Sequence, residues 1–424
     1  MNKLKVNEIS LRQQTQKNSL SDNMINHREL YRLPWTLPDN AISWLEPTAM
    51  CNLACDGCYR ENEKNSHKTL EQVKHELDVF QSKRNSDCIS IAGGDPLLHP
   101  QIVDIVAEIK RRGMKPILNT NGAALTSPYL RELKKAGVYG FTFHVDSKQG
   151  RGGEWKGKNE IELNQLRYHY ARMLAEEGGI SCSFNSTVYE DTLQYVPELV
   201  KWAADNIDIV HTMVFICFRH VVPAMPFDWY AGGQKVDWQK ISYHSDTDRK
   251  VDILSTDILK KVREKFPDFT PAAYLNGTEK VDSFKWLLTE RIGKKGKIFG
   301  YPGPKFLELI MATHHFFKGT YLSYASPKLT CKGRASMILL WPFDKGLRKA
   351  AANYLKNPFR LFNKAHLQTI LFIQPVDFME DGRQSMCDGC PDITVWGDDI
   401  VWSCRLEEQK QFGMFLRSVK REKE

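Results

Sequence analysis

The chain has 424 residues, of which 42% are hydrophobic, and it carries a formal net charge of +8. This length predicts two or three domains, or one large barrel with an appendage. The charge is mild for the size, and the sequence has no basic–aromatic platform of the kind that single-strand binders use, so we expect no nucleic-acid partner. No stretch approaches the roughly 18 apolar residues of a membrane span. The ten cysteines form no disulfide framework and no secretory signal opens the chain, which together predict a reducing, cytoplasmic location.

The first half of the chain alternates between short buried strands and amphipathic helices. A polar extension over residues 1–40 comes first. The expected strands cover residues 42–46, 88–92, 116–118, 140–145, 180–188 and 209–217, and the helices between them cover 70–80, 102–109, 129–136, 161–177 and 197–205. Such alternation predicts parallel pairing with right-handed crossovers. Six units are too few for a closed eight-stranded barrel, so we predict an α/β fold with a partial (β/α)6 TIM-type barrel over residues 41–220.

Three cysteines lie close together directly after the first predicted strand. Cys51, Cys55 and Cys58 fall within eight residues of one another. Cysteine thiolates hold iron–sulfur clusters, and a cubane needs four ligands, so three thiols would leave one iron open to an exchangeable ligand. Zinc is the alternative, although structural zinc sites usually pair two such motifs.

Polar residues follow the other predicted strands at corresponding positions. These are Gly93-Gly94-Asp95-Pro96, Asn119-Thr120-Asn121, His144 with Asp146-Ser147, Asn185-Ser186, and Arg219-His220. The carboxyl ends of barrel strands are where catalytic residues lie. We therefore expect the functional site at this edge of the sheet.

The second half of the chain is less regular. Residues 221–330 are expected to close the barrel from below and to contain helices over 257–265, 283–291 and 306–317. Residues 331–424 form a predicted mixed α/β domain with a hairpin over 393–402. Its cysteines, Cys331, Cys387, Cys390 and Cys404, could supply four thiolates to a second cluster, although the spacing also fits zinc or unligated thiols. Cys88, Cys182 and Cys217 lie in apolar strands and are expected to be buried hydrophobic residues.

A basic amphipathic segment covers residues 345–367. Such a segment either lies on an anionic membrane or forms an ordinary surface helix pair. Together with the apolar stretch 306–317, it favours a hydrophobic, lipid-like substrate and peripheral contact with the inner face of a membrane.

The motif Cys51-x3-Cys55-x2-Cys58, followed by Ile91-Ala92-Gly93-Gly94-Asp95-Pro96, resembles the signature and the GGEP-type motif of the radical S-adenosylmethionine (radical SAM) superfamily. The resemblance covers residues 42–220 and implies the same partial barrel. It implies that the three cysteines hold a [4Fe–4S] cluster whose open iron binds S-adenosylmethionine. The residues that it implies as contacts of that molecule are Gly93, Gly94, Asp95, Asn119, Asp146 and Asn185.

One position departs from the family. Its members often have an aromatic residue near the adenine directly before the third cysteine, but this chain has Gly57 there and Tyr59 after the cysteine. Tyr59 is therefore our candidate for a cofactor contact on this loop.

The motif Cys387-Asp388-Gly389-Cys390, the hairpin and Cys404 resemble the SPASM- or twitch-type auxiliary-cluster extensions of radical SAM enzymes. This implies a second [4Fe–4S] cluster held with Cys331. The resemblance as a whole implies reductive cleavage of S-adenosylmethionine to a 5′-deoxyadenosyl radical, fed by a flavodoxin- or ferredoxin-type electron donor.

That radical would abstract a hydrogen atom from an unactivated carbon of the substrate. Our leading hypothesis is that the substrate is lipid-like. The alternatives are maturation of a ribosomally made peptide and a non-catalytic iron–sulfur or zinc scaffold. No catalytic residue is assigned; Cys217, His220 and Tyr230 are candidate hydrogen donors.

Overall fold

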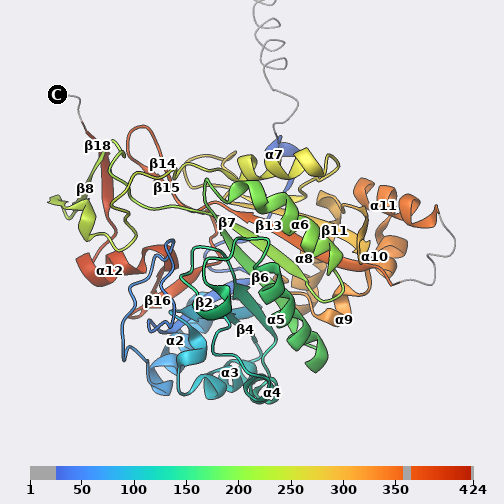
Figure 1. Ribbon diagram of the computed structural model, residues 1–424, viewed down its shortest axis with the longest axis horizontal. Coiled ribbons are helices and arrows are strands. Elements are labelled where there is room, and N and C mark those ends of the chain that lie inside the picture. Colours follow the sequence, from blue (N-terminus) through green and yellow to red (C-terminus); the bar gives the residue numbers. More distant parts are fainter. Residues whose placement is uncertain (1–24, 357–363, 422–424) are drawn as a thin grey trace, which may run out of the picture.

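The computed structural model describes residues 25–356 and 364–421. Most of the chain surrounds an 11-stranded sheet with the order β1-β10-β11-β13-β7-β6-β5-β4-β3-β2, and β12 pairs with β11 (Figure 1). Its parallel strands from the first half are β2 (Ile42–Thr48), β3 (Cys88–Gly93), β4 (Lys115–Thr120), β5 (Gly140–His144), β6 (Ser181–Val188) and β7 (Thr212–Cys217). They lie in chain order, which confirms the predicted partial barrel.

Five helices connect these six strands and cover one face of the sheet. They are α2 (Leu70–Lys83), α3 (Ile102–Arg111), α4 (Ser127–Ala136), α5 (Asn164–Glu177) and α6 (Val196–Asp205). Local signals set their ends: Thr69 and Gln72 form a capping box at α2, and Gly137 ends α4 in the left-handed conformation that glycine adopts without strain.

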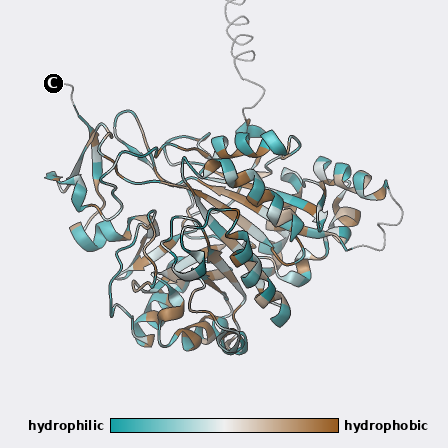
Figure 2. Cartoon of the chain, in the orientation of Figure 1, coloured by the Kyte–Doolittle hydropathy of each residue, from teal (hydrophilic) through white to brown (hydrophobic). Residues whose placement is uncertain are grey.

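The parallel strands are buried on both faces, and Figure 2 shows the central ones in the hydrophobic colours. Ile89 and Phe141 belong to the core under the helices. Their neighbours Cys88 and Ile117 belong to a second core on the opposite face. Burial on both faces is typical of parallel sheets.

The sheet continues beyond the six predicted strands. The strand β13 (His366–Ile373) pairs in parallel with β7 and antiparallel with β11 (Trp286–Lys294). The remaining strands are β10 (Ala273–Leu275), β12 (Lys297–Gly300) and β1 (Tyr31–Arg32). Segments from all four predicted domains, 1–40, 41–220, 221–330 and 331–424, therefore contribute strands to one sheet.

The prediction of a helix over 283–291 is wrong. This segment lies mostly in β11, where eight consecutive residues pair with β13. Residues 286–289 are buried on both faces, and such a short apolar run has no periodicity that separates a strand from a helix. The pairing partner, about 80 residues later in the chain, decides the structure.

The helices of the second half are α7 (Ser255–Lys265), α8 (Pro304–Lys318), α9 (Pro327–Thr330), α10 (Gly333–Leu340) and α11 (Lys345–Leu355). The expected helices over 257–265 and 306–317 are thus confirmed. Of the basic segment 345–367, residues 345–355 form α11, and 357–363 lie outside the described residues, as do residues 1–24 of the amino-terminal extension.

The segment between α8 and α9 covers the amino ends of β3 and β4. The Ser323 hydroxyl donates to Asp87 (2.6 Å), which directly precedes β3. Lys115, the first residue of β4, donates to the Tyr324 carbonyl (3.3 Å). Ser323 and Tyr324 therefore lie over the amino ends of these two strands.

The carboxyl-terminal part adds three small sheets and a helix beside the barrel. The sheets pair β14 (Asp377–Phe378) with β15 (Gln384–Ser385), β16 (Ile393–Trp396) with β17 (Asp399–Trp402), and β18 (Arg417–Lys420) with β8 (Phe227–Ala231), which also pairs with β9 (Gln234–Val236). The β16–β17 pair confirms the predicted hairpin. The helix is α12 (Leu406–Phe412). Within the described ranges, no helix is both long and apolar enough to cross a bilayer.

Candidate functional site

The cysteine loop leaves the carboxyl end of β2 and is held against the end of β3. The amide of Gly94 donates to the Thr48 carbonyl, and the amide of Asp95 donates to the Met50 carbonyl, both at 2.8 Å. A Cβ at Gly94 would lie 2.1 Å from the Met50 oxygen, and one at Gly93 would lie 2.1 Å from the Thr48 oxygen. Only glycine permits such a close approach, so the Gly93-Gly94 pair fixes where the loop begins.

The thiols of Cys51, Cys55 and Cys58 lie near one another. Burial raises the pKa of Cys51 and of Cys55, and the charge of Cys58 raises both pKa values further. Cys51 and Cys55 are half-buried, and Cys58 is exposed. The amide nitrogen of Asn121 lies 3.8 Å from the Cys51 sulfur. Without a bound cation, three such thiols stay protonated at neutral pH.

Asp95 is buried beneath the loop and its carboxylate is already fully engaged. It accepts hydrogen bonds from the Thr120 hydroxyl (2.8 Å to each oxygen) and from the amides of Asn121 (2.9 Å) and Leu97 (3.0 Å). Burial raises its pKa, and these donors partly offset that effect. In this arrangement the carboxylate joins the ends of β3 and β4.

The loop after β5 forms the other wall of the site. The amide of Asp56 donates to the Lys148 carbonyl (2.9 Å), and a Cβ at Gly150 would lie 2.9 Å from the Ala54 carbonyl oxygen. Asp146 accepts from the His144 ring (2.8 Å). Burial alone would raise the pKa of Asp146, but the hydrogen bond and charge of His144 lower it overall.

A cavity of about 150 Å³ lies beside Asp146. Its lining includes Arg151 and Trp155. Arg151 donates to the carbonyls of Asn121 (2.8 Å) and His144 (2.9 Å). Arg151 thus joins the ends of β4 and β5. The sequence analysis missed it, although its position between two glycines in the loop after a predicted strand was an available signal.

The two predicted asparagines differ in their environment. The Asn119 amide donates to the Ser90 hydroxyl (2.7 Å). The Oδ1 atom of Asn185 is buried and has no hydrogen-bond partner among the described residues. Asn185 pairs with His144 across β5 and β6. Because buried polar atoms are normally hydrogen-bonded, this oxygen points to a missing ligand or water at the carboxyl end of β6.

Tyr189 explains why the loop carries Gly57. A Cβ at Gly57 would lie 2.5 Å from the Tyr189 hydroxyl, so a larger residue would require the Tyr189 side chain to shift. Tyr189 follows β6, is buried, and packs against Phe218 with ring centroids 4.8 Å apart and the rings tilted by 34°. Tyr59, by contrast, packs against the cluster around β8. The sequence analysis missed Tyr189, whose only signal was its place after a strand.

A second group of thiols is formed by Cys387, Cys390 and Cys404. The interaction with Cys387 and burial raise the pKa of Cys390, and the charge of Cys404 raises it further. Burial and the charge of Cys387 raise the pKa of Cys404 to about 12. Cys331 lies apart from these three thiols. The two residues after it contact Ala365, at the amino end of β13. Cys387 pairs with Gly277, which lies near the carboxyl end of β13. The structure therefore brings three of these four cysteines together.

Buried arginines join this second group to the barrel. Arg60, two residues after Cys58, forms an ion pair with Glu46 and donates to the Ser403 carbonyl (2.6 Å), next to Cys404. Arg84 donates to the Cys390 carbonyl (2.7 Å), and burial lowers its pKa to about 10. These buried contacts connect the second group of cysteines to the part of the barrel that carries the first.

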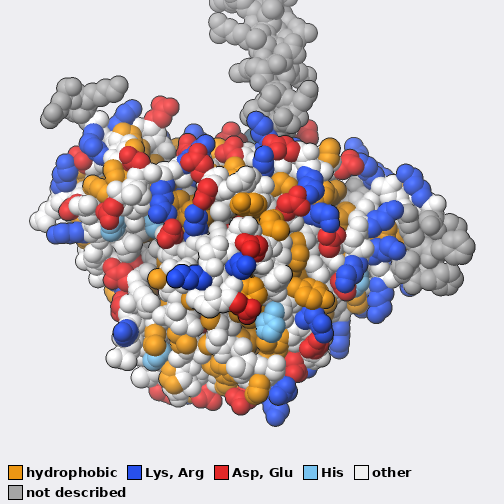
Figure 3. All heavy atoms as spheres, in the orientation of Figure 1, with side chains coloured by type: hydrophobic (Ala, Val, Ile, Leu, Met, Phe, Trp, Pro, Cys, Tyr) orange, Lys and Arg blue, Asp and Glu red, His pale blue; other side chains and the backbone are white. Residues whose placement is uncertain are grey.

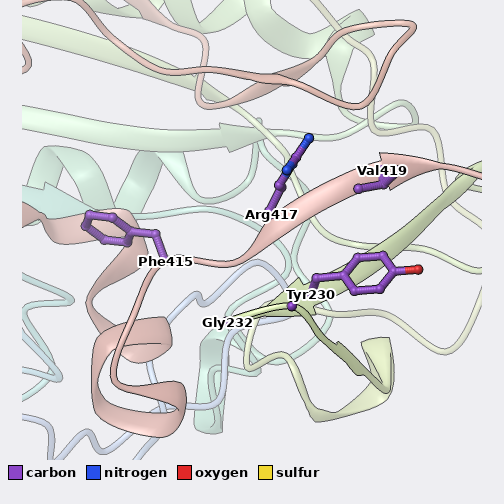
Figure 4. Close-up of a pocket in the computed structure, with 6 residues that line it drawn as sticks. Tyr230, Gly232, Phe415, Arg417 and Val419 are labelled. Carbon is purple, nitrogen blue, oxygen red and sulfur yellow. The ribbon is translucent and has the colours of Figure 1, made fainter.

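The candidate hydrogen donors lie in three different places. Cys217 is buried at the end of β7, where burial raises its pKa to about 12. His220 is buried against Phe218, and burial lowers its pKa to about 4. Tyr230 lies in the small sheet of β8, where it lines a surface hollow of about 400 Å³ with Phe415 and Arg417 (Figure 4).

The comparison with family models decides the class of the domain. Residues 45–151 match the model of the radical SAM superfamily. The chain contains a radical SAM domain. The match includes the cysteine loop, Gly93-Gly94-Asp95 and Asp146, so the motif resemblance and the geometry concern the same residues.

Relatives with curated names match half of this chain or less. An AdoMet-dependent heme synthase of Oleidesulfovibrio alaskensis is 24% identical over 41% of this chain and 46% of its own length. A PqqA peptide cyclase of Gluconobacter oxydans is 25% identical over 50% of this chain and 64% of its own. The chain spans about half the length of the curated relatives it matches.

Among solved structures, Streptococcus suis SuiB bound to S-adenosylmethionine is similar at 16% identity. The match covers 54% of this chain and 48% of that one, with a TM-score of 0.38.

The residues of the loop fit an iron–sulfur cluster. Three neighbouring thiols supply three of the four ligands that a cubane needs. Their raised pKa values mean that binding a cation would release protons, as metal binding to cysteine does. The close approach at Gly93-Gly94 holds the loop without occupying its thiol face. The group of Cys387, Cys390 and Cys404 offers the same donor set, with Asp392 two residues from Cys390.

Proposed function

We propose that this protein is an iron–sulfur enzyme that reductively cleaves S-adenosylmethionine and transfers a hydrogen atom from a carbon of its substrate. The observation that carries the proposal is the thiol loop of a radical SAM domain, held at the carboxyl edge of the sheet beside an unpartnered buried amide oxygen. When bound to Cys51, Cys55 and Cys58, the cluster would supply the electron that breaks the sulfonium bond.

The chain's own residues would bind and shield the cofactor molecule. Asn185 offers its free Oδ1 as an acceptor for a hydroxyl or ammonium group. Gly93 and Gly94 leave backbone space next to the loop, and Asp95 holds that backbone in place. Tyr189, whose hydroxyl lies next to Gly57, would replace Tyr59 as the aromatic contact of the cofactor on this loop.

A peptide is the substrate class that the observations favour. Several curated relatives are named PqqA peptide cyclases. The lipid-like substrate that we expected rested on the apolar stretch 306–317 and the basic segment 345–367. The described parts of both lie at the amino edge of the sheet: His315 contacts Asp39, and α11 packs on β12. They do not lie near the thiol loop, so they no longer support that substrate.

Release of 5′-deoxyadenosine by the anaerobically reconstituted protein tests this function. We expect release with a strong chemical reductant or a flavodoxin- or ferredoxin-type donor, stimulated by a peptide-containing polar extract more than by a lipid extract. Stimulation by lipid alone would contradict the peptide proposal. The variants Cys51→Ala, Cys55→Ala and Cys58→Ala should abolish release, whereas Cys331→Ala, a half-buried cysteine outside both groups, should retain it. Iron-loaded wild-type protein that releases none under any condition would favour the scaffold alternative.

A further inference from the structure

A cluster of large apolar side chains is exposed on the last turn of α10 and in the turn that leads to α11. Ile338, Leu339, Trp341 and Phe343 have 63%, 69%, 49% and 62% of their surface exposed. Four such residues within six positions form a contiguous apolar patch, which soluble monomers rarely leave uncovered. Below we call residues 338–343 the apolar patch.

The surrounding packing holds this patch outward. Gly333 and Met337 are the buried residues of α10, and the Gly333 amide donates to the Ala365 carbonyl next to β13 (2.9 Å). Directly after the patch, buried Asp344 caps α11 and accepts from the Gly303 amide (2.9 Å). The patch is therefore fixed to the body at both ends, and its exposure does not result from a loose loop.

The patch is set in a strongly basic part of the chain. Residues 304–356 contain nine lysine and arginine residues and two acidic residues, a net charge of +7. Of the two carboxylates, Asp344 is buried and Glu308 pairs with Lys305 (2.6 Å). Arg348 donates to the Pro342 carbonyl within the patch (2.8 Å). Lysine and arginine side chains gather at this end of the molecule in Figure 3.

We propose that this surface docks the protein on a membrane that contains anionic lipids. Apolar side chains with tryptophan, bordered by lysine and arginine, are typical of surfaces that lie at the headgroup level of a bilayer. The excess of basic residues over residues 304–356 fits a negatively charged partner, although Lys349 already pairs with the exposed Asp268 (2.9 Å). Phe316 and Phe317, at the end of α8, are 81% and 75% exposed and lie toward the same amino edge of the sheet, which would widen the contact.

This placement leaves the thiol loop free. The patch lies near the amino end of β13, and the loop follows the carboxyl end of β2. A docked molecule would therefore keep its thiol edge turned toward the aqueous phase, accessible to a donor protein and to a substrate. The proposal rests on the surface alone and does not depend on the proposed function.

Co-sedimentation of the full-length protein with vesicles tests the docking. We expect binding to phosphatidylcholine vesicles containing about one-third phosphatidylglycerol, weak binding to pure phosphatidylcholine, and loss of binding as salt screens the charges. The double variant Ile338→Ser/Phe343→Ser should weaken binding more than about tenfold. The double variant Lys345→Gln/Arg348→Gln should weaken it about 25-fold, because each basic residue near an anionic surface contributes a factor of about five.

Matched controls separate the patch from general surface effects. Val281→Ser/Leu254→Ser removes two exposed apolar side chains elsewhere, and Lys134→Gln/Lys135→Gln removes two charges from α4; both should bind like wild type. Brominated lipid should quench the fluorescence of wild type more than that of Trp341→Phe. Failure of wild type to bind anionic vesicles, or equal binding by the patch variants, would overturn the proposal. The proposal would also be overturned if the wild type formed a dimer that did not bind vesicles and that Ile338→Ser/Phe343→Ser converted to a monomer. The patch would then join two copies of the chain.

Discussion

Substituting Gly94 by alanine tests how the thiol loop is held. The new Cβ would lie 2.1 Å from the Met50 oxygen, 2.4 Å from its carbonyl carbon and 2.6 Å from the Ala49 oxygen. All three are backbone atoms, so no side chain can rotate away. The loop and the end of β3 must separate by about 1 Å, because real Cβ contacts are rarely shorter than about 3.0 Å.

This separation would weaken the two 2.8 Å hydrogen bonds donated by Gly94 and Asp95. At about 1 kcal/mol each, their loss shifts the equilibrium between docked and undocked loop by about 2 kcal/mol, or about 30-fold. We therefore expect Gly94→Ala to lose most of its iron and most of its 5′-deoxyadenosine release, while the barrel itself stays folded.

Gly152→Ala is the matched control. Gly152 has an ordinary φ of −90°, and a Cβ there meets nothing within 4 Å. Iron per chain after anaerobic reconstitution, 5′-deoxyadenosine release and thermal unfolding should be measured for both variants. Wild-type iron content and release in Gly94→Ala would refute the reasoning that this close approach positions the loop.

Three further predictions follow from individual residues. Asn185→Ala should raise the KM for S-adenosylmethionine by about tenfold and leave the melting temperature unchanged. Asn119→Ala, which breaks a hydrogen bond within the sheet, should lower the melting temperature. The opposite pattern would exclude Asn185 as a ligand contact. Cys387→Ala should lower the iron content by about four atoms per chain, the content of one cubane, and Cys331→Ala should leave it unchanged; equal losses would place Cys331 among the ligands. Burial raises the pKa of Glu290 to about 7, so the folded state binds its proton more tightly than the unfolded state and stability falls as the pH rises from about 4.5 to 7. Urea unfolding of Glu290→Gln should lack this part of the pH dependence, and an identical profile in both proteins would contradict it.

The strands and helices of the first half were predictable because each carries a local signal. Short apolar runs, helix caps and glycine stops occur within a few residues of the elements that they define. The thiol loop and the glycine pair were predictable for the same reason, since their spacing along the chain is itself the signal.

The parts that sequence analysis missed depend on partners far away in the chain. β11 is a strand because it pairs with β13. Cys331 lies apart from the other thiols because its neighbour Lys332 pairs with Ala365, at the amino end of β13. The roles of Arg151 and Tyr189 likewise depend on which loop each one meets. Asp95 followed its motif, but only the fold reveals that its carboxylate is occupied by Thr120 and Asn121.

The arrangement of polar and apolar groups assigns different tasks to the two edges of the sheet. At the carboxyl edge, the buried Asp95 carboxylate accepts hydrogen bonds at both oxygens, and buried Arg60 connects the two groups of thiols. One buried oxygen there, on Asn185, lacks a partner among the described residues. At the amino edge, the residues that break the usual burial pattern are apolar and exposed. The Asn185 oxygen can accept a hydrogen bond from a bound small molecule, and the exposed apolar side chains can contact a large apolar surface. The same chain would therefore bind its reactants at one edge and its membrane at the other.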